Sequence, residues 1–247
     1  MSSRRITICL CSARSLIERD KVLDISGKLC QAGYTVFLEE DLCEKALSSV
    51  ADMEKIASSV VVACYPRAVF SLFDSIGLTP VQVVDIRNVG QEDVLSHFNL
   101  SGHSDNKDVS VFLPDTDKTK TEGAKNDSDN EHLPDKAGFD AWYPVIDRER
   151  CNNCRKCHDF CLFGVYSNED GKIVVKNPAN CKNNCPACAR VCPRKAIIFP
   201  KYEKSPINGG LADEEHAMSL DTKALYADAL RKKLAERKKG ISLLKRR

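Results

Sequence analysis

The sequence predicts a small α/β domain with a parallel sheet, followed by a cysteine-rich α+β module and a C-terminal helix. In residues 4–98, short β-branched apolar runs alternate with longer amphipathic segments, which is typical of parallel strands joined by helices. The chain has 13 cysteines, and eight of them fall between Cys151 and Cys192. We therefore expect four parts in the 247 residues, in this order: an α/β domain, a flexible polar linker, the cysteine-rich module, and a C-terminal helix with a basic tail. Their bounds are 1–98, 99–141, 142–203 and 204–247.

Four apolar runs in the first part do not alternate with polar residues, as expected of strands buried on both faces of a sheet. These runs are Ile6–Leu10, Thr35–Leu38, Val60–Ala63 and Val81–Ile86. The segments between them predict helices at Leu16–Gln31, Ala46–Ala57 and Arg67–Ser75. Gly33 and Gly77 follow the first and third of these helices, where a helix commonly ends. Right-handed crossovers then give a small doubly wound sheet.

The eight clustered cysteines form two quartets. The first reads C-x₂-C-x₂-C-x₃-C and the second C-x₃-C-x₂-C-x₃-C-P. Gaps of two or three residues allow consecutive thiolates to wrap one side of an iron–sulfur cluster, while the fourth cysteine points away from it. This spacing predicts cluster ligands. The first quartet is Cys151, Cys154, Cys157 and Cys161, and the second is Cys181, Cys185, Cys188 and Cys192.

These two quartets, together with an internal repeat of the same form, resemble the bacterial two-cluster ferredoxins over roughly Val145 to Phe199. The resemblance implies an α+β ferredoxin-like module with two 4Fe–4S clusters, in which the fourth cysteine of each run binds the other cluster. One ligand set is then Cys151, Cys154, Cys157 and Cys192, and the other is Cys161, Cys181, Cys185 and Cys188. Leu162 replaces a proline usual in the family, and the second quartet has one extra residue after Cys181, so no potential is assigned.

Structural zinc is the main alternative, since two zinc sites also use eight thiolates, although usually as separated pairs. Disulfides are disfavoured because nothing at the start of the sequence resembles a signal peptide: Arg4 and Arg5 precede only a five-residue apolar run. No segment is long enough to span a bilayer. We therefore expect a reducing, cytoplasmic compartment, where dense cysteines indicate metal.

The other five cysteines lie in the α/β domain. Cys9 and Cys11 close the first predicted strand, Cys64 closes the third, and Cys43 follows the second. Ligands of open α/β sheets gather at the carboxyl ends of strands. Cys30 lies in the middle of a predicted helix and is interpreted as a small core residue. From the residues alone, a metal site and a set of buried inert thiols are both open for the other four.

A second resemblance bears on this choice. The segments Ile8–Cys11, Val61–Arg67, Gly77–Pro80 and Asp85–Asn88 occur in the same order as in the N-terminal domain of the flavoprotein subunit of heterodisulfide reductase. The resemblance covers about residues 4–98 and implies a third 4Fe–4S cluster, with Cys9, Cys11, Cys43 and Cys64 as its ligands. The sequence departs from that family at Ser12, where glycine is usual, and lacks a further cysteine near Gln91; both departures bear on cluster stability. The relatives continue into a flavin domain, but this chain has no G-x-G-x-x-G motif, so no flavin is expected.

The remaining segments are polar or basic. The linker 99–141 is too polar to build a core, so we expect the two modules to change their separation freely. Trp142 and Tyr143 are predicted to pack on the small cysteine-rich module. From about Leu211 a helix is expected, followed beyond Asp228 by an almost wholly basic stretch. A solvated face or docking to an acidic redox partner is favoured there over membrane or nucleic-acid contact.

Nothing in the sequence resembles a nucleophile–base pair, a phosphate loop or a flavin site, so no bond-making chemistry is expected of this chain alone. The leading hypothesis is an electron carrier that relays single electrons through 4Fe–4S clusters to or from a redox partner. A second is a non-catalytic electron-transfer subunit of a heterodisulfide-reductase-like or flavin-linked oxidoreductase complex, with a flavoprotein as partner. A third is a cluster-based sensor or zinc interaction module. The net charge of +2 favours no particular partner.

Overall fold

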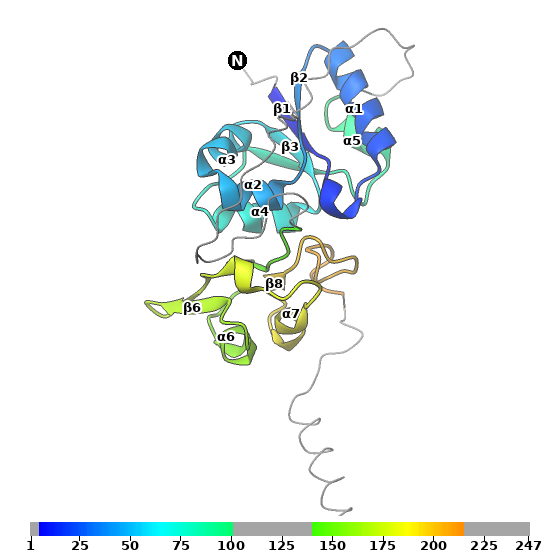
Figure 1. Cartoon of the computed structure of the whole chain (residues 1–247). Helices are drawn as coiled ribbons and strands as arrows, with labels where there is room; N and C mark the ends of the chain where they lie inside the picture. The colour runs from blue at the N-terminus through cyan, green and yellow to red at the C-terminus, as the bar shows by residue number, and fades with distance from the viewer. Residues whose placement is uncertain (1–4, 101–139, 215–247) are drawn as a thin grey trace, which may run out of the picture.

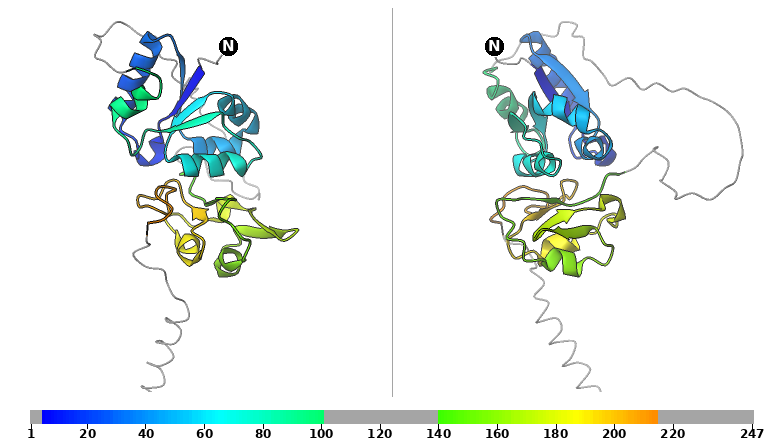
Figure 2. Two further views of the ribbon diagram at one scale, coloured as in Figure 1. Left: turned by 180° about the vertical axis from the view of Figure 1, so that it is seen from behind. Right: turned by 90° about the vertical axis from the view of Figure 1, so that its left-hand side faces the viewer.

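The computed structural model describes residues 5–100 and 140–214 (Figure 1). These residues form an α/β domain and the cysteine-rich module, which lie against each other in every view (Figures 1 and 2).

The sheet of the α/β domain has four parallel strands in the order β2-β1-β3-β4. Their bounds are β1 (Arg5–Cys9), β2 (Thr35–Glu39), β3 (Val60–Ala63) and β4 (Gln82–Asp85). Each strand agrees within one residue at either end with an apolar run of the sequence. In the central strands, Ile6, Ile8 and Val62 are fully buried, because helices cover both faces of the sheet.

Five α-helices surround this sheet. They are α1 (Arg19–Gln31), α2 (Leu42–Ser48), α3 (Val50–Ala57), α4 (Pro66–Asp74) and α5 (Gln91–Ser96), and a short 3₁₀ helix (Ser12–Arg14) precedes α1. Helix α1 contacts α5, and α2 contacts α4. Right-handed crossovers place the first pair on one face of the sheet and the second pair, with α3, on the other. The two faces can be followed in Figure 2.

The helix bounds differ from the sequence prediction in three places. The predicted helix Ala46–Ala57 is wrong, because Ser49 is extended (φ −152°) and divides it into α2 and α3. The Ser49 hydroxyl accepts a hydrogen bond from the Asp52 amide at 3.3 Å, so this residue caps the start of α3. Helix α1 begins at Arg19 rather than Leu16, and α5 was not predicted from the sequence.

The cysteine-rich module consists of two short antiparallel pairs and two short helices. Strand β5 (Val145–Ile146) pairs with β8 (Ile197–Ile198), and β6 (Tyr166–Glu169) forms a hairpin with β7 (Lys172–Val175). Helix α6 (Lys156–Phe160) contacts α7 (Ala187–Val191), and a 3₁₀ helix (Pro178–Asn180) lies before the second quartet. Of the two aromatic residues expected to pack on the module, Trp142 does so: its ring stacks on Phe199 with centroids 5.1 Å apart. Tyr143 packs instead within the core of the α/β domain.

The two modules share an apolar core. Tyr143, Val145 and Ile198 of the cysteine-rich module pack within the core of the α/β domain. The contact is also polar, since the Arg67 guanidinium donates to the Asp147 carboxylate at 2.6 Å. Figure 1 shows the cysteine-rich module below α2 and α4. The two modules are therefore in contact in the structure, and the burial of apolar side chains favours this contact. Most of the linker that was expected to let them separate lies outside the described residues, so that expectation stays a prediction.

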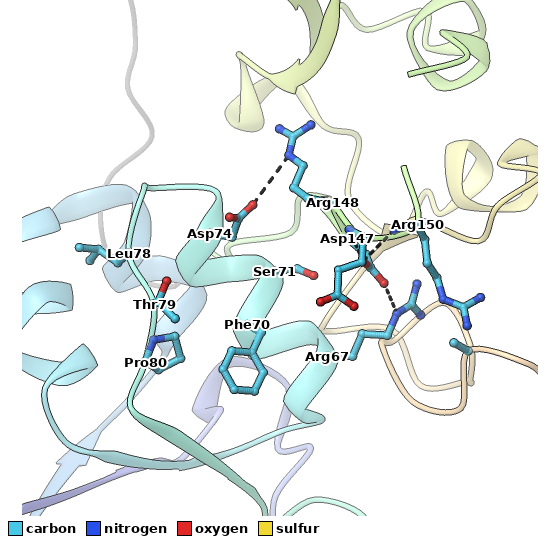
Figure 3. A pocket seen from close by; sticks show the side chains of 12 residues that line it. Arg67, Phe70, Ser71, Asp74, Leu78, Thr79, Pro80, Asp147, Arg148 and Arg150 are labelled. Atoms are coloured by element: carbon cyan, nitrogen blue, oxygen red, sulfur yellow. Dashed lines mark hydrogen bonds and ion pairs between the residues drawn. The ribbon is translucent and has the colours of Figure 1, made fainter. Parts of the chain in front are cut away.

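A pocket of about 480 Å³ lies at this junction, between α4 and the segment that leads into the first quartet (Figure 3). Its charged side chains largely pair with one another: besides Arg67 with Asp147, Arg148 lies 3.8 Å from Asp74. None of its twelve lining residues is a cysteine. The pocket therefore belongs to the packing of the modules rather than to a candidate metal centre.

The described residues end before most of the predicted C-terminal helix. Residues 211–214 form a turn, and the basic stretch beyond Asp228 lies outside the described residues, as does most of the linker (101–139). In residues 5–100 and 140–214, no helix has both the length and the apolar character needed to cross a membrane.

Candidate metal centres

All thirteen cysteines lie within the described residues, and every one of them is a free thiol. Twelve of them gather into three groups of four, and the remaining one, Cys30, lies apart from these groups in α1.

The first group combines three cysteines of the first quartet with the last cysteine of the second. Burial, together with the nearby thiols of Cys192, Cys151 and Cys154, raises the pKa of Cys157 to about 12. These four cysteines are therefore electrostatic neighbours, although Cys192 is far away in sequence. It is brought here because it ends α7, which packs beside α6, the helix that carries Cys157.

The loop that carries the first three thiols has an unusual backbone. Asn153 and Arg155 both have positive φ values, 55° and 65°, which turn the chain back on itself between consecutive cysteines. The Asn153 side chain secures the loop, because its carbonyl oxygen accepts a hydrogen bond from the Ile173 amide of β7 at 3.1 Å. On the other side, the Ala196 amide donates to the Cys192 sulfur at 3.3 Å. Amide donors of this kind are typical of sulfur ligands in iron–sulfur sites.

The second group is made of the other four ferredoxin-type cysteines. Burial, together with the nearby thiols of Cys185 and Cys161, raises the pKa of Cys181 to about 12. Burial likewise raises the pKa of Cys188 to about 12, against the opposing effect of a hydrogen bond in which the Tyr166 hydroxyl donates to the Cys188 sulfur at 3.1 Å. Here Cys161, the last cysteine of the first quartet, has joined the second one.

These four sulfurs line a cavity of about 500 Å³ whose other walls are mostly apolar. Three apolar side chains at its edge are exposed to solvent, Phe160 to 42%, Leu162 to 92% and Phe163 to 45%. Leu162, the residue that stands where the resembling family usually has proline, is thus an exposed side chain that lines this cavity.

The third group lies at the carboxyl edge of the parallel sheet. Cys9 ends β1, Cys64 follows β3, and these strands are neighbours. Cys11 is placed beside them by a left-handed backbone (φ 48°), and Cys43 lies in the first turn of α2. All four line one small cavity of about 20 Å³, which Pro200 of the cysteine-rich module closes from the other side.

Apart from Asp41, the other residues that line this cavity are apolar, and Cys9, Cys11 and Cys43 are buried while Cys64 is partly exposed. Burial raises the pKa of all four, that of Cys11 to about 11 and that of Cys64 to about 12. Such thiols are protonated near neutral pH, so binding a metal there would release protons. Cys43, which the resemblance placed only by its neighbourhood in the chain, lies with the other three in the fold.

Two aromatic residues connect this third group to the second. The Tyr143 hydroxyl donates to the Cys43 carbonyl at 2.7 Å, and both groups are buried. The preceding residue, Trp142, has a buried indole N–H without a hydrogen-bond partner among the described residues; it lies near Cys181 and opposes the rise in the pKa of that thiol. The sequence predicts only a packing role for these aromatics, and no pattern in it signals their contact with the two cysteine groups.

The donor sets fit iron–sulfur clusters. Each group presents four sulfurs from four cysteines, with Cys157 buried in the first, Cys188 in the second, and Cys9, Cys11 and Cys43 in the third. Two of the groups also have N–H or O–H donors to sulfur. In the two described stretches, no set of three or more Cys, His, Asp or Glu side chains has the geometry to hold a single metal ion. In a cluster each thiolate binds a different iron, so that finding concerns single ions only.

Comparisons with known proteins agree with the cysteine pattern. No family model matches the chain. It is 55% identical over 67 residues to an uncharacterised ferredoxin of Methanocaldococcus jannaschii, a match that covers 27% of this chain and 45% of that protein. It is 37% identical over 58 residues to another uncharacterised ferredoxin of the same organism, covering 22% of this chain and 74% of that protein. With Ferredoxin-3 of Nostoc it shares 30% identity over 88 residues, covering 27% of this chain and 90% of that protein.

Two of these relatives are covered over most of their length, whereas the chain spans less than half of the first. The three cysteine groups and these matches together define an iron–sulfur protein. The chain belongs to the ferredoxin family, and it contains a ferredoxin-type iron–sulfur domain.

Proposed function

We propose that this chain relays single electrons through three 4Fe–4S clusters to or from a redox partner. The observation that carries the proposal is the gathering of twelve cysteines into three groups of four, each with at least one buried thiol. The first two ligand sets are Cys151, Cys154, Cys157 and Cys192, and Cys161, Cys181, Cys185 and Cys188. The third set is Cys9, Cys11, Cys43 and Cys64.

A 4Fe–4S cluster, when bound, supplies a one-electron couple whose potential depends on burial, net charge and hydrogen bonds to its sulfurs. The residues of this chain provide each of these influences. Apolar side chains around Cys157 and Cys188 limit the access of water to the sulfurs. The Tyr166 hydroxyl and the Ala196 amide donate to cysteine sulfur and thereby favour extra negative charge there.

Exchange with a partner is expected at the mouth of the second cavity. Phe160, Leu162 and Phe163 are exposed there, beside the sulfurs of the second group. Exposed apolar patches commonly mark interaction sites.

A second candidate function is that of a non-catalytic electron-transfer subunit in a heterodisulfide-reductase-like or flavin-linked complex. It is favoured by the third cysteine group, which is assembled from the segments that carry the resemblance to that family, such as Ile8–Cys11 and Val61–Arg67. Purification of the tagged chain from its native cells separates the two candidates: a subunit co-purifies with a flavoprotein in fixed ratio, and a free carrier does not.

The proposal is tested by reductive titration of anaerobically purified full-length protein with dithionite. Three 4Fe–4S clusters should take up about three electrons per chain, with bleaching of the brown colour and new electron paramagnetic resonance (EPR) signals. Cys64→Ser should remove about a third of the iron. The matched control is Cys30→Ser, because Cys30 lies outside all three groups, and it should keep the full amount. Colourless protein that binds zinc without sulfide contradicts the proposal.

A further inference from the structure

A buried lysine of the cysteine-rich module lies next to the cysteine group of the α/β domain. The side chain of Lys201 is only 2% exposed, and its amine pairs with Asp41 at 2.5 Å and with Asp140 at 3.1 Å. Asp41 is itself 4% exposed and belongs to the α/β domain. Charged side chains are rarely buried so deeply without a partner or a function. Lys201 is therefore a charge that one module inserts into the other.

The backbone on either side of this lysine is held in place by the α/β domain. The Arg87 guanidinium donates to the carbonyls of Pro200 and Tyr202, each at 2.9 Å. Arg87 follows the end of β4, at the same edge of the sheet as the third cysteine group. Pro200 lines the cavity that contains the four sulfurs. The segment of residues 200–202 thus forms one wall of this cavity. The two hydrogen bonds from Arg87 hold the backbone on both sides of Lys201 in place.

The position of Lys201 relative to the sulfurs follows from Asp41. One oxygen of Asp41 pairs with Lys201, and the other accepts hydrogen bonds from the amides of Cys43 and Glu44 at 2.9 and 3.2 Å. Asp41 is thus the N-cap of the helix that carries Cys43. Asp41 and Pro200 both line the cavity of the four sulfurs, so the amine of Lys201, paired with Asp41, lies beside that cavity.

We propose that Lys201 is a positioning residue that sets the reduction potential of the cluster held by Cys9, Cys11, Cys43 and Cys64. The inference rests on the proposed function, because it requires that third cluster. A 4Fe–4S cluster with four thiolates carries net negative charge, and adding one electron increases that charge. A fixed cation at low dielectric favours the reduced form and raises the potential. The potential of this cluster then depends on the docking of the cysteine-rich module, which supplies the lysine.

A purely structural role for Lys201, as a bridge between the modules, would leave the potential unaffected by charge. Two substitutions of opposite sign separate the roles. Lys201→Gln removes the positive charge and keeps a donor for Asp41, whereas Asp140→Asn removes a negative charge beside the lysine and keeps the shape. Lys201→Arg keeps the charge. Lys55→Gln is the matched control, because Lys55 is a 64% exposed lysine of α3 whose charge is screened by water.

The experiment is a redox titration of anaerobically purified full-length variants with dithionite, followed by EPR. The signal of the third cluster is the one that Cys64→Ser removes. We expect Lys201→Gln to move this signal to lower potential and Asp140→Asn to move it to higher potential. Lys201→Arg and Lys55→Gln should leave it in place, and the other two clusters should not move in any variant. Thermal unfolding of each variant shows whether the fold is retained.

If the EPR signal of the third cluster keeps its potential in both Lys201→Gln and Asp140→Asn, this inference is overturned and the proposed function is left intact. Equal shifts of all three signals also overturn it, because they indicate a general change in structure. Wild-type protein with only two clusters overturns the inference together with the third cluster of the proposed function. If Lys201→Gln does not fold, Asp140→Asn decides alone, since an unchanged or lowered potential in that variant contradicts the proposed role of the charge.

Discussion

Tyr166→Phe is the substitution whose effect on electron transfer can be worked out most directly. The Tyr166 hydroxyl donates to the Cys188 sulfur at 3.1 Å, and both side chains are buried, at 6% and 7% exposure. Phenylalanine keeps the ring and removes only this donor. Because a hydrogen bond to sulfur is stronger when the cluster carries more negative charge, it favours the reduced state. The substitution should therefore lower the potential of the cluster in the second cysteine group.

The size of the shift follows from the energy of the bond. A hydrogen bond to a charged group contributes about 1.5–3 kcal/mol. Only the difference between the two redox states counts; if about a third of the bond energy differs, the change is about 0.5–1 kcal/mol. Since about 1.4 kcal/mol corresponds to about 59 mV for one electron, the expected decrease is about 20–40 mV.

The assay is an EPR-monitored redox titration of wild type and Tyr166→Phe under the same salt and pH. One of the two ferredoxin signals should move to lower potential, and the other should stay. Tyr34→Phe is a suitable control, because Tyr34 packs on Phe98 in the α/β domain, away from the second cysteine group. A potential that is unchanged or raised in Tyr166→Phe would refute the role assigned to this hydrogen bond.

Three further substitutions test the packing of the two modules by chemical denaturation. Arg67→Ala leaves the buried Asp147 carboxylate with only its backbone partners and should lower the free energy of unfolding by about 2–3 kcal/mol; no loss would mean that the pair contributes nothing to docking. Gly209→Ala places a Cβ 2.6 Å from a side chain of α4, at a residue with a φ of +91°. It should lower the free energy of unfolding by about 2 kcal/mol more than Gly171→Ala, a control with a similar φ of +81° and no neighbour within reach of the Cβ. Equal losses in the two variants would show that the close approach is absent. Tyr143→Phe removes a buried 2.7 Å hydrogen bond to a carbonyl of α2 and should cost about 1 kcal/mol; an unchanged midpoint would contradict this contact.

Local patterns in the sequence predicted the elements that depend on local chemistry. The apolar runs that form β1 to β4 are continuous and rich in β-branched residues. This pattern is typical of strands that are covered on both faces of the sheet. The cysteine spacings C-x₂-C-x₂-C-x₃-C and C-x₃-C-x₂-C-x₃-C indicated which thiols would share a loop. The exchange of Cys161 and Cys192 between the quartets came from the family resemblance, and the structure brings each beside the cysteines that the resemblance gave it.

Contacts between distant segments were not predictable in this way. A lone lysine in a loop, such as Lys201, carries no signal that it will be buried against Asp41 in the other module. The same holds for the bond of Tyr166 to Cys188, because a tyrosine in a strand is ordinary. The break at Ser49 was missed because Ala46 to Ala57 has helical residues throughout, and the serine side chain ends one helix and caps the next. Such features depend on contacts made in the packed structure rather than on the spacing of apolar residues along the chain.

The most direct test of the central claim is the content of iron, acid-labile sulfide and zinc in anaerobically purified full-length protein. Three 4Fe–4S clusters predict about twelve irons and as many sulfides per chain, with no stoichiometric zinc. About eight irons would contradict the cluster at Cys9, Cys11, Cys43 and Cys64 and leave the two ferredoxin-type sites. Stoichiometric zinc without sulfide would contradict the electron-transfer account as a whole.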